Sequence, residues 1–131
     1  MQEILQLIYT SVLSPATPIS EVSSIIRSSR NKNFSYGITG VLLFDGQHFC
    51  QYIEGEASHV NALTENIRKD SRNVNFKVIC SHPAQGMRKF SNWRAGYPME
   101  CSPDVILKIM ATPRDCLLVD FLQMTRSFDL V

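Results

Sequence analysis

The chain has 131 residues, of which 44% are hydrophobic, and its 13 lysines and arginines nearly balance 12 aspartates and glutamates. A chain of this length buries roughly two-thirds of the surface that it exposes when unfolded, so one domain forms its core without a disulfide or a structural metal. A net charge of +1 provides no general attraction to nucleic acid or to an anionic membrane. We therefore expect neither nucleic acid nor membrane as a direct partner.

The N-terminus and the cysteines predict a cytoplasmic protein. Residues 1–4 lack the basic and apolar regions of an export signal, and no apolar run approaches the ~20 residues of a membrane span. The cysteines, Cys50, Cys80, Cys101 and Cys116, form no C-x-x-C pair and are typical of reduced thiols.

The N-terminal part of the chain predicts a strand followed by a helix. Apolar side chains recur at every second position from Leu5 to Tyr9, which is the period of a strand with one apolar face. Thr17 and Pro18 then provide a cap and a first helical position, and apolar residues follow at helical spacing as far as Ser29. This pattern indicates an amphipathic helix.

The middle of the chain predicts a hairpin, a second helix and two more strands. Apolar runs at 38–44 and 48–53 flank Asp45-Gly46, a dipeptide that suits a tight turn. The elements expected after the hairpin are a helix, a strand and a short strand, at 60–70, 74–78 and 90–97.

This order of elements, β-α-β-β-α-β-β, predicts an α+β fold of ferredoxin-like type with both helices on one face of the sheet. Two further caps with prolines, Ser102-Pro103 and Thr112-Pro113, predict helices near 103–111 and 113–128. Because their apolar residues are too many for a solvated tail, we expect this helical pair to pack on the open face of the sheet.

Three polar groups are predicted to enter the apolar layer between sheet and helices. Gln51 shares strand parity with Phe49 and Ile53, and Tyr9 lies on the apolar face of the first strand. Asn33, just after the first helix, is near enough along the chain to reach the same layer. A buried amide needs partners, because each unmet hydrogen bond costs ~1–3 kcal/mol.

Two interpretations of these groups stay open at this point. Tyr9 and Gln51 could simply bond each other or a buried water. Alternatively, they could edge a slot between the helices that suits a flat heteroaromatic ligand. Other chemistry has little support, since His48, His59 and His82 have no metal-ligand spacing and no glycine-rich phosphate loop or G-x-S-x-G motif occurs.

Four segments, in this order and spacing, resemble the BLUF family of blue-light sensors that use flavin. They are Leu7-Ile8-Tyr9-Thr10-Ser11, Asn33 with Gly37-Ile38-Thr39-Gly40-Val41-Leu42-Leu43-Phe44, Phe49-Cys50-Gln51-Tyr52-Ile53-Glu54-Gly55, and Arg88-Lys89-Phe90 with Trp93. Asp70-Ser71-Arg72 also looks like the family's Asp-x-Arg after the second helix. The resemblance covers about residues 4–98.

The resemblance implies a non-covalently bound FAD, with FMN or riboflavin as alternatives. The flavin ring would lie between the helices, with Ile25 and Ile67 as apolar walls. Asn33 would hold its carbonyl and N3 edge, Gln51 would bond N5 and the C4 carbonyl, and Arg72 would reach the C2 side. The implied cofactor-binding residues are Tyr9, Ile25, Asn33, Phe49, Gln51, Ile67, Asp70 and Arg72.

The resemblance also implies a photoreceptor rather than an enzyme. Blue light would move an electron and then a proton from Tyr9 to the flavin, and their return would leave Gln51 rotated or tautomerised. Trp93 would be the third photoactive residue. Many family members carry Trp-x-Met here, whereas this chain has Trp93-Arg94-Ala95, so a relay through that methionine cannot operate.

We expect residues 1–98 to form the flavin-binding photosensor core and 99–131 to form a helical output segment of the same domain. That segment would signal to a separate partner protein or to another copy of the chain. The alternative is a BLUF-like module without flavin or signalling that works by protein contact alone. A small flavin redox enzyme is disfavoured, because no acid-base pair is evident.

Overall fold

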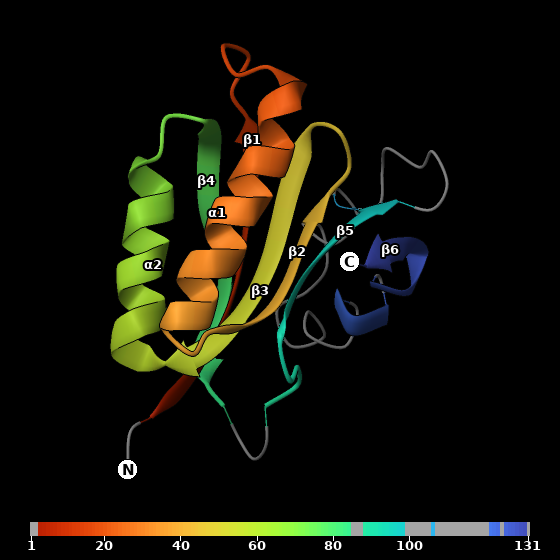
Figure 1. The fold of residues 1–131 in the computed structure, drawn as a ribbon. Coiled ribbons are helices and arrows are strands. Elements are labelled where there is room, and N and C mark those ends of the chain that lie inside the picture. The colour runs from red at the N-terminus through yellow and green to blue at the C-terminus, as the bar shows by residue number, and fades with distance from the viewer. Residues whose placement is uncertain (1–2, 85–87, 99–105, 107–120, 124, 131) are drawn as a thin grey trace.

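Six strands form one sheet in the order β4-β1-β3-β2-β5-β6. The computed structural model describes residues 3–84, 88–98, 106, 121–123 and 125–130 (Figure 1). The strands are β1 (Ile4–Leu13), β2 (Thr39–Phe44), β3 (His48–Glu56), β4 (Asn73–Pro83), β5 (Trp93–Pro98) and β6 (Phe128–Leu130).

The first four strands and two helices have the predicted arrangement. Strand β1 lies between β3 and β4 and is antiparallel to both, and β2 is antiparallel to β3. Helix α1 (Val22–Ser35) connects β1 to β2, helix α2 (Ala57–Lys69) connects β3 to β4, and both cover the same face of the sheet (Figure 1). Strand β5 then adds to β2 in parallel, so the sheet is mixed and the α+β class is confirmed.

Several boundaries differ from the prediction, and Asn33, expected just after the first helix, lies inside α1. A 3-10 turn, Ile19–Glu21, precedes α1, and its cap residue is the extended Pro18 without a side-chain cap bond, so Thr17 does not cap the helix. Strand β4 extends well beyond 74–78, to Asn73–Pro83. Its exposed residues pair with β1 through backbone hydrogen bonds, which need no apolar alternation.

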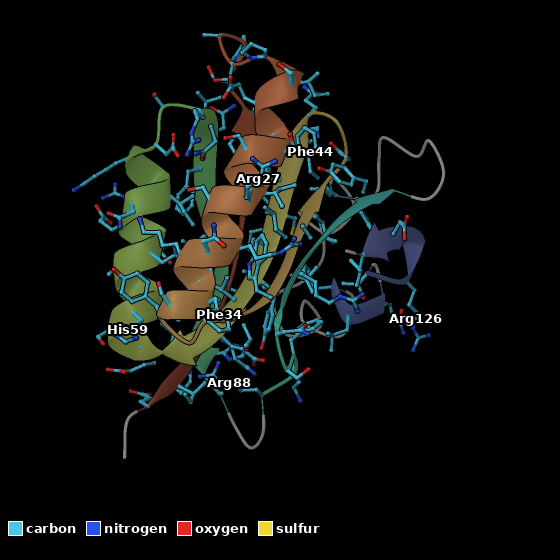
Figure 2. All side chains as sticks on the ribbon, in the orientation of Figure 1. Arg27, Phe34, Phe44, His59, Arg88 and Arg126 are labelled. Atoms are coloured by element: carbon cyan, nitrogen blue, oxygen red, sulfur yellow. The ribbon has the colours of Figure 1, made fainter. Side chains whose placement is uncertain are left out.

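The two faces of the sheet carry separate apolar cores. On the helix face, α1 packs on one cluster that consists of Val22, Ile26, Leu42, Phe44, Phe49, Trp93 and Ala95. Helix α2 packs on a second cluster that consists of Leu7, Tyr9, Ile38, Ile53, Val60 and Leu63. Polar and exposed residues such as Arg27 lie on the outer side of the helices (Figure 2). None of the helices in the described ranges is long and apolar enough to cross a membrane.

The opposite face, called the tail face below, carries a third cluster. It consists of Ile8, Val41, Leu43, Cys50, Tyr52, Ile79, Ile106, Phe121 and Phe128. Residues 106, 121 and 128 come from the C-terminal part of the chain and pack on this face. The predicted helices at 103–111 and 113–128 otherwise lie mostly outside the described residues.

The end of the second predicted helix is wrong. Residues 121–123 are helical, but a 3-10 turn, Thr125–Ser127, follows, and Phe128–Leu130 then forms β6. Strand β6 pairs with β5 in antiparallel orientation, so backbone N–H and C=O groups on the outer side of β5 have hydrogen-bond partners. Phe128 and Leu130 alternate with the exposed Asp129, which is the strand period, and both pack on the tail-face cluster.

Candidate functional site

Three buried polar side chains are joined by hydrogen bonds in the layer between sheet and helices. Tyr9 and Gln51 are direct partners across β1 and β3. The Nε2 group of Gln51 donates to the Tyr9 hydroxyl oxygen at 2.7 Å, and the Trp93 indole Nε1 donates to Gln51 Oε1 at 2.9 Å. The exposed fractions of Tyr9, Gln51 and Trp93 are only 4%, 2% and 7%. The predicted contact between Tyr9 and Gln51 is therefore present, and Trp93 extends it to β5.

The Tyr9 phenol is held in its neutral form. Burial raises the pKa of Tyr9 far above its usual range, and the hydrogen bond from Gln51 offsets only part of that rise. The ring also packs against Phe76 of β4 with centroids 4.9 Å apart. A neutral phenol retains both an electron and a proton that it can give up together.

The orientation of the Gln51 amide is coupled to the position of Trp93. An indole N–H donates but cannot accept, so Trp93 selects the arrangement in which Gln51 Oε1 faces it. Rotation of the amide would bring two N–H groups face to face and would break this bond. The Arg30 guanidinium lies 5.6 Å from the Trp93 ring centroid, and this cation-π contact also holds the indole.

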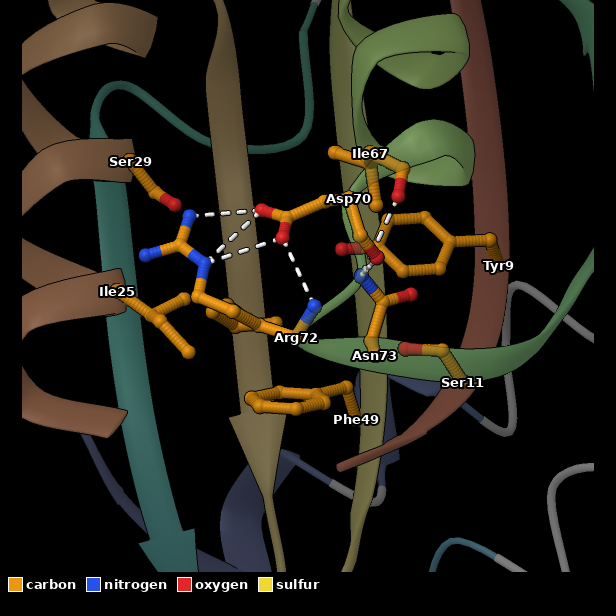
Figure 3. A pocket seen from close by; sticks show the side chains of 10 residues that line it. Tyr9, Ser11, Ile25, Ser29, Phe49, Ile67, Asp70, Arg72 and Asn73 are labelled. Atoms are coloured by element: carbon orange, nitrogen blue, oxygen red, sulfur yellow. Dashed lines mark hydrogen bonds and ion pairs between the residues drawn. The ribbon is translucent and has the colours of Figure 1, made fainter. Parts of the chain in front are cut away.

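A pocket open to solvent lies beside these residues, between the two helices (Figure 3). Its lining consists of Tyr9, Ser11, Ile25, Ser29, Leu42, Phe49, Ile67, Asp70, Arg72 and Asn73. Ile25 lines it from α1 and Ile67 from the end of α2, as the predicted walls require. Six of the eight predicted cofactor-binding residues thus line one pocket. Gln51 lies next to it through Tyr9, while Asn33 does not line it.

A cation is fixed at this pocket by an ion pair. The Arg72 guanidinium contacts Asp70 at 2.7 Å from Nη2 and at 3.1 Å from Nε, and the Arg72 backbone N–H donates to the same carboxylate at 3.0 Å. These bonds hold the pKa of Asp70 below its usual range and raise the pKa of Arg72. Arg72 extends across the pocket toward Ser29 of α1 (Figure 3), where it can donate to a ligand oxygen.

Two buried amide oxygens near the helix ends have no hydrogen-bond partner. Asn33 Oδ1 and Asn73 Oδ1 are both unpaired, although the Asn73 amide donates to the backbone oxygens of Ile67 and Asp70. Unpaired buried acceptors are costly, so such atoms are suited to receive an N–H of a ligand. Asn73 is the one of the two that lines the pocket, and together with the Arg72 donor and the apolar walls its oxygen fits a flat heteroaromatic ring with carbonyl and N–H groups along one edge.

Four lining residues are not in the predicted cofactor-binding set, although three of them carried a signal. Ser11 shares strand parity with Tyr9, and Ser29 lies one helical turn after Ile25. Leu42 is the direct partner of Gln51 across β2 and β3. Asn73 follows Arg72, and only the turn after α2 brings it to the pocket.

Comparison with known proteins agrees with this site. Residues 4–96 match the model of the BLUF family, which is described as sensors of blue light using FAD. The chain therefore belongs to the BLUF family of flavin-using blue-light photoreceptors.

Individual relatives refine that assignment. The chain is 31% identical over 85 residues to the blue light- and temperature-regulated antirepressor BluF of Escherichia coli (strain K12), a match that covers 63% of this chain but only 21% of BluF. The chain thus spans about a fifth of that relative's length. The dark-state structure of the BLUF protein BlrB is 29% identical, covers 95% of this chain and 96% of its own, and has a TM-score of 0.79. Klebsiella pneumoniae BlrP1, solved with FMN and cyclic diGMP, shares the fold at 23% identity, with a TM-score of 0.72 over 93% of this chain and 35% of BlrP1.

Proposed function

We propose that this chain binds a flavin without a covalent bond in the pocket between α1 and α2 and switches the Tyr9–Gln51–Trp93 hydrogen bonds in blue light. The observation that carries the proposal is the buried Gln51 amide, which lies beside the pocket and bonds one aromatic partner through each of its two polar atoms. FAD is the flavin that the family description names, with FMN and riboflavin as alternatives.

The residues around the pocket suit the parts of a flavin. Ile25 and Ile67 are apolar groups from opposite helices, which suit the two faces of a flat ring. Arg72, oriented by Asp70, is a donor for a ring carbonyl, and Asn73 Oδ1 is an unused acceptor. Phe49 adds an apolar floor. Asn33 does not line the pocket, but its Oδ1 is also unpaired, and we assign to it the single imide N–H of the ring.

The switch follows from the chemistry of three side chains. A bound flavin supplies an excited state, reached with blue light, that accepts an electron. Tyr9 would give that electron and then its hydroxyl proton to the flavin, which its neutral form allows. When both return, Gln51 is left in a second arrangement in which its N–H faces Trp93, and the Trp93 bond is lost. A buried amide with two alternative sets of partners is a two-state element.

The output belongs to the same proposal. Residues 1–98 form the photosensor core, and 99–131 form an output segment that acts on a separate protein or on a second copy of the chain, without enzymatic turnover. Ile106 and Phe121 are fully buried against the tail face, so a change in the sheet has a direct route to this segment. A protein partner also agrees with the name of the antirepressor relative. Cys50 and Cys80 form no disulfide with each other, which agrees with a cytoplasmic location.

Absorption spectra test the proposal. The purified protein should show a flavin spectrum that shifts slightly to the red under blue light and recovers in darkness. Tyr9→Phe should keep the flavin and lose the shift, whereas Tyr97→Phe, a half-exposed tyrosine on β5, should keep both. A shift that survives in Tyr9→Phe would refute the role of Tyr9. A flavin that bleaches instead would favour redox chemistry, and a colourless protein after flavin supplementation would favour the flavin-free interaction module.

A further inference from the structure

A buried carboxylate on the tail face has no part in the switch described so far. Glu54 lies on β3, three residues after Gln51, and its exposed fraction is 0%. Its Oε2 atom accepts a hydrogen bond from the Tyr52 hydroxyl at 2.8 Å, and its Oε1 atom accepts from the Phe90 backbone N–H at 2.8 Å. Thr39 adds a longer bond to Oε1 at 3.4 Å. Both carboxylate oxygens are therefore in use.

One of these bonds holds the segment that leads into β5. Phe90 precedes Trp93 by three residues, and the backbone oxygen of Asn92 accepts from Gly40 of β2 at 3.1 Å. Arg88 also holds this segment, because its Nη1 group donates to the Gly37 backbone oxygen at 2.7 Å. Figure 2 shows Arg88 at the same end of the molecule as Phe34. The position of Trp93 thus depends on how firmly this segment is held.

The other bond orients an aromatic ring toward the C-terminal part of the chain. The Tyr52 ring lies 5.5 Å from Phe90 and 5.9 Å from Phe121, measured between ring centroids. Burial and the hydrogen bond to Glu54 raise the pKa of Tyr52 well above its usual range, so its hydroxyl remains a donor. One carboxylate therefore links the segment before Trp93 to the ring on which Phe121 packs.

Burial of the Glu54 carboxylate costs free energy. Removal of a carboxylate from water costs several kcal/mol unless hydrogen bonds compensate it, and an apolar residue would fill a plain core at lower cost. Three donors from β2, β3 and the segment before β5 converge on Glu54 instead. Because Thr39 and Phe90 lie outside β3, the carboxylate fixes β2 and the segment before β5 relative to β3.

We propose that Glu54 is a positioning residue for the light response. Through Phe90 it holds the start of β5 so that Trp93 stays bonded to Gln51 in the dark, and through Tyr52 it transmits a change in the sheet to Phe121. The inference rests on the proposed photoreceptor function. It also supplies a route to the C-terminal segment that needs no methionine at position 95.

The chain offers a matched pair of variants. Glu54→Met keeps the length of the side chain but accepts from neither Phe90 nor Tyr52. Glu54→Gln should keep both contacts, because its amide oxygen can accept from the Phe90 N–H while its amide N–H donates to the Tyr52 oxygen; the Tyr52 bond is then reversed, and the Tyr52 hydroxyl proton loses its acceptor. Tyr52→Phe deletes the hydroxyl bonds to Glu54 and to Gln6 and leaves the Phe90 bond intact.

The readout is specific because the chain has a single tryptophan. In the flavin-loaded full chain, the hydrogen exchange rate of the indole N–H reports the Trp93 bond to Gln51 in the dark. Glu54→Met should raise this rate about tenfold, which corresponds to 1.4 kcal/mol, whereas Glu54→Gln and Tyr52→Phe should leave it within about twofold. Light should change amide exchange at residues 121–130 in the wild type and in Glu54→Gln, but not in Tyr52→Phe or Glu54→Met.

The outcomes separate this inference from the function on which it rests. If the wild type shows no light-induced shift, the proposed function itself fails. If the shift is normal but Glu54→Met leaves the indole exchange unchanged, the positioning role is refuted. If Glu54→Met does not fold, Tyr52→Phe decides, since a normal light response at residues 121–130 in that variant refutes the route through Tyr52.

Discussion

The Tyr9–Gln51 hydrogen bond should be measurable as a coupling energy in a double-mutant cycle. Tyr9→Phe leaves the buried Gln51 N–H without its acceptor, which costs about 1–3 kcal/mol of unfolding free energy. Gln51→Leu leaves the Tyr9 oxygen without its donor and the Trp93 indole without its acceptor, so it should cost more. In the double variant only the Trp93 indole remains unpaired.

The coupling energy follows from this comparison. The double variant avoids two of the three penalties that the single variants incur, so its cost should fall short of their sum by about 2 kcal/mol, taking about 1 kcal/mol for each avoided penalty. Urea unfolding in the dark gives the unfolding free energy of the wild type, the two single variants and the double variant. Flavin is left out, because a ligand that binds only the folded state raises the apparent stability. Costs that add to within about 0.5 kcal/mol would refute the reasoning.

Three further predictions concern the pocket and the sheet. The pKa of Asp70 is lowered in the folded state, so the ionised carboxylate stabilises the fold above its ordinary pKa of about 3.9, and this stabilisation is lost as the pH falls through the lower folded value. Asp70→Asn should therefore cost up to about 1 kcal/mol of unfolding free energy in urea at pH 7. Equal costs at pH 7 and at pH 2 would contradict the ion pair. Gly40→Ala should cost about 3 kcal/mol of unfolding free energy or more, because the added Cβ would overlap the Tyr52 backbone oxygen. Gly37→Asn should cost under about 1 kcal/mol, since the φ of 66° at Gly37 suits asparagine and its surroundings are open. Equal melting temperatures of the two variants would contradict the difference between these two positions. Phe128→Ala should lower the unfolding free energy by about 3–5 kcal/mol, because its buried ring packs on the tail-face cluster, and a loss under about 1 kcal/mol would contradict that burial.

Local periodicity was enough to predict most of the fold. The strand period placed Tyr9 and Gln51 on the same face as Leu7 and Ile53, and these residues do meet the helices there. The helical period placed Val60 and Leu63 toward the sheet, and both are buried. These predictions succeed because burial of one face is a property of each element on its own.

Long-range pairing was not available from periodicity. Phe128 to Leu130 has the alternation of a strand, but its partner β5 is about thirty residues away, and the caps at 102 and 112 favoured a helix there instead. The full length of β4 was not predicted for the same reason, since backbone pairing with β1 extends this strand through exposed residues. A short segment takes its conformation from such partners when its own preference is weak.

The features of the site also fall into those that the sequence determined and those that the tertiary structure decided. The sequence by itself determined that a phenol and an amide share one buried layer, because residue parity and hydrophobic spacing decide which side chains turn inward. Only the tertiary structure decided that Trp93 donates to Gln51, that Arg72 and Asp70 meet at the pocket, and that Glu54 joins Tyr52 to Phe90. Each of these contacts depends on the distance and direction of side chains from separate elements, which sequence spacing does not specify.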